Sequence, residues 1–168
     1  AIRLDPRLAK AHHSLGTALR GKNQLPDAIV ALRETVRLDP RNAVAFADLG
    51  DTLQEDNDID GALAAYQASL ALVPNSAFVR NNIGYVFMRK NNLDRAVAEW
   101  REATTIDPKY AAPFGNLGEA LASKGDTKGA IAAYERFLAL VPRDAPASAD
   151  VRQRLEKLRA PGPVLHEA

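Results

Sequence analysis

The chain has 168 residues, which is enough for one domain of ordinary size. Its 22 basic and 21 acidic residues balance, and this argues against bulk electrostatic attraction to nucleic acid or to an anionic membrane. The absence of cysteine excludes a disulfide scaffold and a thiolate metal site. Because no apolar run is long enough to span a bilayer, we expect no membrane insertion and no nucleic-acid binding.

The sequence repeats itself every 34 residues, and several kinds of position keep this period. A proline closes each unit, at Pro6, Pro40, Pro74, Pro108 and Pro142. A glycine follows an aliphatic residue at Gly16, Gly50, Gly84 and Gly118. An alanine comes later in each unit, with a large residue four positions after it, at Ala28 and Leu32, Ala62 and Tyr66, Ala96 and Trp100, and Ala130 and Tyr134. This self-similarity indicates a repeat protein.

Each unit is expected to form two antiparallel helices, as residues 43–76 illustrate. Apolar residues at helical spacing predict one helix over 43–55 and another from 59 to 72, with turn formers between them. Pro74 ends the second helix because its ring removes a backbone donor. Gly50 and Ala62 are small where the helices cross. Neither helix can bury its apolar face alone, so stacked copies must share a core.

These positions resemble the tetratricopeptide repeat family, whose pattern is an aromatic residue, Leu-Gly, a large apolar residue, Ala with an aromatic four later, and Pro. The resemblance covers four repeats, at residues 9–42, 43–76, 77–110 and 111–144. It implies an all-α fold, a right-handed superhelical α-solenoid of helix-turn-helix repeats. The leading aromatic is present as Phe46 and Phe114 but is replaced by His12 and Arg80, where we expect softer packing.

The two ends differ from the repeats. Residues 1–8 match the end of a preceding repeat, so we expect the chain to be a piece of something longer. Residues 145–160 predict one further helix with a polar outer face, which is the cap that a solenoid needs. Residues 161–168 predict a flexible tail. The compartment stays open: the cytoplasm is favoured, and a targeting signal upstream would change that.

No convergent set of catalytic groups is visible, so we expect no enzymatic activity, no cofactor and no metal. Residues 16–23 match the phosphate-loop pattern except at Asn23, but they belong to an expected helix and follow no strand. His12 and His13 are adjacent, and adjacent helical side chains point about 100° apart. The pair therefore cannot chelate one ion from one face, and His12 is expected to fill the aromatic position.

The resemblance implies that the first helix of each repeat lines a concave groove. Asn82 and Asn116 hold equivalent positions there, and their amides offer a donor and an acceptor to the backbone of an extended peptide. The alternatives are solvated amides or hydrogen bonds between helices. Phe78, Tyr85 and Met88 form an apolar stripe on the same face, as contact sites often do, unless neighbouring helices bury them.

Acidic residues gather on the second repeat, where Asp48, Asp51 and Glu55 share one helical face. They are expected to attract a basic side chain of a partner, unless they form a merely solvated surface. Four further groove candidates complete the set: His13, Asn81, Arg89 and Glu119. The basic clamp with which some relatives hold the carboxylate of a chaperone tail has no matching Lys or Arg pair, so we expect no binding of that type.

The sequence therefore predicts a non-catalytic protein–protein interaction scaffold that binds a peptide or protein segment in its groove. One alternative is self-assembly into a homo-oligomer, either through the ends of the array or through the tail around Val164 and Leu165. Another is that the array is the recruiting or regulatory part of a larger enzyme. The partner itself does not follow, because one repeat fold serves many roles.

Overall fold

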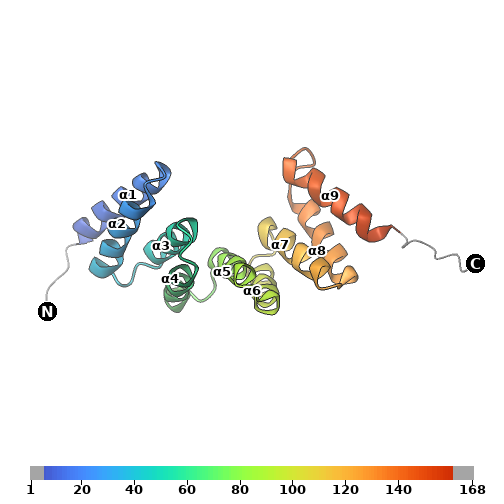
Figure 1. Cartoon of the computed structure of the whole chain (residues 1–168), viewed down its shortest axis with the longest axis horizontal. Helices are drawn as coiled ribbons and strands as arrows, with labels where there is room; N and C mark the ends of the chain where they lie inside the picture. The colour runs from blue at the N-terminus through green and yellow to red at the C-terminus, as the bar shows by residue number, and fades with distance from the viewer. Residues whose placement is uncertain (1–5, 161–168) are drawn as a thin grey trace, which may run out of the picture.

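A computed structural model describes residues 6–160 and shows nine helices joined by short turns, with no strand in that range (Figure 1). The expected end of a preceding repeat in residues 1–5 and the expected tail in residues 161–168 lie outside the described residues. In chain order the helices are α1 (Pro6–Gly21), α2 (Leu25–Leu38), α3 (Ala43–Glu55), α4 (Ile59–Leu72), α5 (Ala77–Arg89), α6 (Leu93–Ile106), α7 (Ala111–Ser123), α8 (Thr127–Leu140) and α9 (Pro146–Arg159).

The helices pack as a row of hairpins. α1 packs on α2, α3 on α4, α5 on α6 and α7 on α8, and each hairpin stacks on the next through α2 with α3, α4 with α5, α6 with α7 and α8 with α9. Figure 1 shows the hairpins following one another along a curve, with α1 at one end and α9 at the other. The predicted all-α solenoid of helix-turn-helix units with a terminal helix is therefore confirmed.

Each hairpin closes where a glycine meets a large side chain. A methyl group added at Gly84 would lie 2.5 Å from Nε1 of Trp100, which is fully buried. Such a contact is far shorter than van der Waals distance, so the helices approach this closely only because the glycine has no side chain. The same contact recurs between Gly16 and Leu32, Gly50 and Tyr66, and Gly118 and Tyr134.

The turn inside each hairpin also keeps the repeat period. One residue of every turn has a positive φ, at Asn23 (59°), Asn57 (67°), Asn91 (56°) and Gly125 (79°). Glycine and asparagine tolerate this left-handed conformation better than other residues. The following residue then caps the next helix in three of the four turns; the side chain of Asp58, for example, accepts a hydrogen bond of 2.9 Å from the backbone N–H of Gly61.

One apolar core runs from the first to the fourth hairpin, and a smaller cluster joins α8 to α9. Val151 and Leu155 of α9 are buried against Tyr134 and Phe137 of α8. At the two positions that depart from the aromatic pattern, His12 is half-buried and Arg80 donates a hydrogen bond of 2.9 Å to Glu99. The segment that resembles a phosphate loop lies on α1 as far as Gly21, so it has helical geometry.

Candidate functional site

The odd-numbered helices lie on the inside of the curve, because α1 contacts α3 and α3 contacts α5 across the hairpins. Their exposed sides form the concave face, and the residues expected to line a groove lie on these helices. Three groups of side chains define this face: a polar network over α3, α5 and α7, an aromatic group near the start of α5, and charged pairs toward both ends.

The polar network is built from three asparagines and one aspartate. Nδ2 of Asn116 donates to Oδ1 of Asn81 at 2.9 Å, and Nδ2 of Asn81 donates to Oδ1 of Asn82 at 3.2 Å. Nδ2 of Asn82 then donates to Oδ1 of Asp51 at 2.8 Å. A chain of hydrogen bonds thus crosses three successive inner helices. We refer to these four residues as the asparagine network.

Asn81 differs from the other groove candidates because it is buried, with only 8% of its surface exposed. Its backbone carbonyl accepts a hydrogen bond of 3.0 Å from Nε1 of the core residue Trp100. Its side chain sits between those of Asn82 and Asn116 and fixes how both amides are oriented. Asn81 therefore supports the two half-exposed asparagines from below, and it offers little surface of its own.

Asn82 and Asn116 keep spare hydrogen-bonding capacity despite the network. A side-chain amide has two N–H groups and an oxygen with two lone pairs. Asn82 uses one N–H and one lone pair, and Asn116 uses one N–H, in bonds to the described residues. Both side chains are only half-buried. Each can therefore still donate to and accept from a ligand without a change of orientation.

Asp51 connects the asparagine network to the first hairpin and to the core. Its Oδ1 also accepts a hydrogen bond of 2.6 Å from the hydroxyl of Tyr66, and Nη1 of Arg20 lies 3.4 Å from its Oδ2. Burial raises the pKa of the Asp51 carboxyl above its ordinary value, while the bonds from Tyr66 and Asn82 and the charge of Arg20 oppose this rise. Burial and the Asp51 charge together raise the pKa of the Tyr66 hydroxyl.

The acidic face of the second repeat already has partners on α1. Nε2 of His13 lies 2.6 Å from Oδ2 of Asp48, and Arg20 donates to Oε1 of Glu55 at 2.6 Å as well as approaching Asp51. The structure thus brings His13 together with the three acidic residues. These pairs orient α1 against α3, and they neutralise part of the charge that a basic partner would meet.

The predicted apolar stripe on α5 is graded in exposure. Phe78 is 48% exposed and Tyr85 36% exposed, whereas Met88 is partly buried against the core. Arg89 follows on the same helix and donates a hydrogen bond of 2.7 Å to the side chain of Asn57. The exposed part of the stripe is therefore aromatic.

Tyr110 joins Phe78 in a small pocket that sequence reasoning missed. This pocket has a volume of about 420 Å³ and lies between the start of α5 and the turn that precedes α7, with Ser76 and Ile106 also on its wall. Tyr110 stands at the N-cap of α7, where Asn42 and Ser76 cap the equivalent helices, yet it makes no capping hydrogen bond. A tyrosine in a capping position was the available signal.

The far end of the concave face is formed by α7, α8 and α9. Nη1 of Arg154 lies 3.2 Å from Oε1 of Glu119, and Nε of Arg154 lies 2.8 Å from Oδ2 of Asp150. A pocket of about 260 Å³ lies there, with Asn116 and Tyr134 on its wall. Glu119 was expected from the sequence; Arg154 was not, because its helix was expected only as a cap.

Two kinds of site were also searched for within residues 6–160. No group of three or more His, Cys, Asp or Glu side chains that could hold a metal ion occurs in this range. None of the described helices combines the length and the apolar character needed to cross a membrane.

Comparisons with solved structures agree with this fold. A crystal structure of MamA matches with a TM-score of 0.76 and 20% identity, covering 90% of this chain and 86% of its own. A structure from work on Pseudomonas aeruginosa pilF matches with a TM-score of 0.76 and 25% identity, covering 90% and 70%. PilW, described as a widely conserved type IV pilus biogenesis factor, matches with a TM-score of 0.76 and 23% identity, covering 89% and 70%.

Sequence comparisons give the family. Among curated proteins no sequence matches this chain. Family models described as tetratricopeptide repeat match residues 13–77 and 114–148, and one described as TPR repeat matches residues 84–125. These matches fall on the hairpins whose glycine, alanine and proline positions carry the period. The chain belongs to the tetratricopeptide repeat family, whose fold its structure shares.

Proposed function

We propose that this chain is a non-catalytic scaffold that binds an extended segment of a partner protein along its concave face. Membership of the tetratricopeptide repeat family supports a protein-interaction scaffold in general. The observation that carries the groove proposal is the asparagine network, because it holds the amides of Asn82 and Asn116 in fixed orientations on neighbouring inner helices.

Fixed amides favour recognition of a backbone. An extended peptide presents alternating N–H and C=O groups, and an asparagine amide can pair with both kinds. Because Asn81 and Asp51 orient the two amides in advance, binding does not have to order these side chains, and less conformational entropy is lost. This mode of binding makes few demands on the partner's sequence.

Aromatic contacts supply a second element of the proposal. The pocket beside Phe78 and Tyr110 lies next to the asparagine network, since Tyr110 is close enough to Asp51 for the aspartate charge to contribute to its raised pKa. Burial is the larger cause of that raised pKa. We propose that an apolar side chain of the bound segment enters this pocket while its backbone pairs with Asn82 and Asn116.

The test is selection of binders from a random peptide library on the purified protein. The Asn82→Ala/Asn116→Ala double variant is run beside it, with Gln67→Ala on the exposed surface of α4 as the matched control. We expect the double variant to bind selected peptides about tenfold more weakly, because each lost hydrogen bond contributes about 0.5–1.5 kcal/mol. The control should bind as the unchanged protein does.

The two asparagines also bond to neighbouring helices, so the double variant must be checked for folding. Its far-ultraviolet circular dichroism and its thermal midpoint should show a folded solenoid at the temperature of the binding assay. Folded double variants that bind the selected peptides with unchanged affinity would contradict the proposed role of the network.

A further inference from the structure

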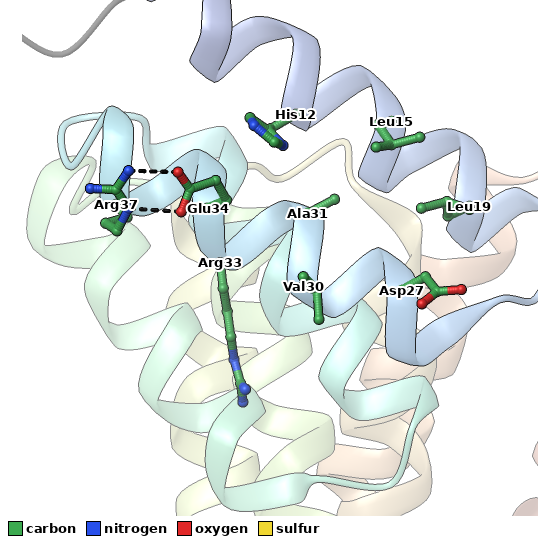
Figure 2. Close-up of a pocket in the computed structure, with 9 residues that line it drawn as sticks. All are labelled: His12, Leu15, Leu19, Asp27, Val30, Ala31, Arg33, Glu34 and Arg37. Atoms are coloured by element: carbon green, nitrogen blue, oxygen red, sulfur yellow. Dashed lines mark hydrogen bonds and ion pairs between the residues drawn. The ribbon is translucent and has the colours of Figure 1, made fainter.

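The largest pocket of the described structure lies away from the concave face, at the α1 end of the solenoid. It has a volume of about 750 Å³ and opens between α1 and α2 (Figure 2). Leu15 and Leu19 point into it from α1, and Val30 lies opposite on α2. We refer to this surface as the N-terminal face; its full lining is His12, Leu15, Leu19, Asp27, Val30, Ala31, Arg33, Glu34 and Arg37.

The residues of the N-terminal face are buried wherever the repeat places them further along the chain. Leu15 is 51% exposed, whereas Leu49, 34 positions later, is 6% exposed and Leu117 is 8% exposed. The difference arises because α2 packs on α3 and α6 packs on α7, while no described helix occupies the equivalent place on α1. Val30, at 68%, is the most exposed large apolar side chain of the described residues.

The opposite end of the solenoid is polar. α9 occupies the position that the first helix of a fifth repeat would have, and Arg152 stands where Gly118 stands one repeat earlier. Nη2 of Arg152 donates a hydrogen bond of 2.6 Å to the backbone carbonyl of Arg143. The outer side of α9 therefore presents charged groups, and it is a poor match for an apolar surface. Stacking of one copy's N-terminal face on another copy's α9 is disfavoured.

The charges on the N-terminal face are arranged symmetrically about Val30. Asp27 lies three residues before it and Arg33 three residues after it on α2. Glu34 and Arg37 bond to each other, as Figure 2 shows, at 2.6 and 2.7 Å. Within the described residues neither Asp27 nor Arg33 has an ion-pair partner. An antiparallel pair of α2 helices centred on Val30 would bring each Asp27 opposite the other copy's Arg33.

We propose that two copies of this chain pair through their N-terminal faces, with their α2 helices antiparallel about a two-fold axis near Val30. Such an interface is isologous, so each apolar face covers the other and assembly closes at two copies. Burial of apolar surface drives the pairing, and the two Asp27–Arg33 contacts set its register. The proposal does not depend on what the concave face binds.

The first test measures the oligomeric state of the 168-residue protein by sedimentation over a concentration series. We expect a dimer, and we expect Val30→Glu to weaken it by about 100-fold or more, because the substitution places two charges at the centre of the apolar contact. Ala64→Glu is the matched control, since Ala64 holds the same exposed position one repeat later. It should leave the dimer unchanged.

The second test exchanges the charges. Asp27→Arg and Arg33→Asp should each weaken the dimer by about tenfold, because each places like charges opposite one another twice. The combined Asp27→Arg/Arg33→Asp variant restores opposite charges and should recover the affinity of the unchanged protein. Recovery would not follow if the two positions acted only through folding.

Three outcomes would overturn the proposal. One is a monomer at every concentration, which would leave a helix from another source as the occupant of the face. Another is a dimer that Val30→Glu leaves intact, which would place the interface elsewhere. The third is a failure of the combined charge variant to recover the dimer. None of them bears on peptide binding by the Asn82 and Asn116 amides, which is measured separately.

Discussion

The two ends of the solenoid carry different surfaces on the same helical register. At the α1 end, Leu15 is half-exposed and the pocket beside it is apolar. At the α9 end, Val151 and Leu155 are buried against α8, and Arg152 and its neighbours face outward. The repeat pattern specifies how a helix packs on its predecessor, so a helix without a predecessor leaves its apolar side uncovered.

The comparison also separates the two tasks of an end. α9 covers the last hairpin and cannot accept another outer helix in the usual way, because Arg152 occupies the crossing position that glycine holds elsewhere. α1 retains Gly16 at its crossing with α2 and retains the apolar residues of an internal repeat. The α9 end is therefore built to terminate the array, and the α1 end is built to be covered.

The largest expected effect contrasts two leucines in the same register. Leu49→Ala should lower the free energy of unfolding by about 2–5 kcal/mol because it leaves a cavity in the core. Leu15→Ala should cost less than about 1 kcal/mol, since half of that side chain already meets solvent. Denaturant unfolding at a concentration where the protein is monomeric measures both. Equal losses would mean that Leu15 is covered after all.

A smaller effect is expected at the crossing positions. Gly118→Ala would place a methyl group 2.5 Å from the buried ring of Tyr134, and such overpacking costs about 1–3 kcal/mol. At the equivalent position of α9, Arg152→Ala removes only its hydrogen bond to the carbonyl of Arg143, so we expect a loss below about 1 kcal/mol. Thermal unfolding of the two variants compares them. A larger loss for Arg152→Ala would contradict the distinction between a crossing and a cap.

The smallest effect concerns how charged pairs join each end to the middle of the array. The Asp51 side chain is 14% exposed, and burial raises its pKa, so the folded protein binds this proton more readily than the unfolded chain. Relative to Asp51→Asn, the free energy of unfolding of the unchanged protein should therefore fall as pH rises from about 4 through the raised pKa.

The matched variant at the other end is Glu119→Gln, whose carboxylate is 56% exposed and pairs with Arg154. We expect this substitution to change the free energy of unfolding only slightly. Unfolding measured from pH 4 to pH 8 checks both variants. If the advantage of the unchanged protein over Asp51→Asn grew with pH, attraction to Arg20 would outweigh the burial of the carboxylate.

The fold follows from the sequence because the same residues recur at the same spacing. Gly50 and Tyr66 recur as Gly84 and Trp100, and a contact this close permits one helix crossing only. The turns were predicted as turns, but the left-handed residue inside each was not singled out. The boundary of α1 at Pro6 also came from the structure, since the resemblance began at residue 9.

The candidate site followed from the sequence only in part. Helical geometry placed Asn82 and Asn116 on the inner helices, but it did not show that Asn81, one position away, is buried between them. The angle between neighbouring inner helices decides that, and no residue pattern within one repeat encodes it. Tyr110 and Arg154 were missed for a related reason, because each reaches the concave face from outside a repeat's first helix.

The most direct test of the account follows the side-chain amide resonances of Asn82 and Asn116 by NMR while a selected peptide is added. The account predicts that these two resonances shift together with those of Phe78 and Tyr110, and that signals from α2, α4 and α6 stay in place. Shifts confined to those outer helices or to the N-terminal face would contradict binding along the concave face.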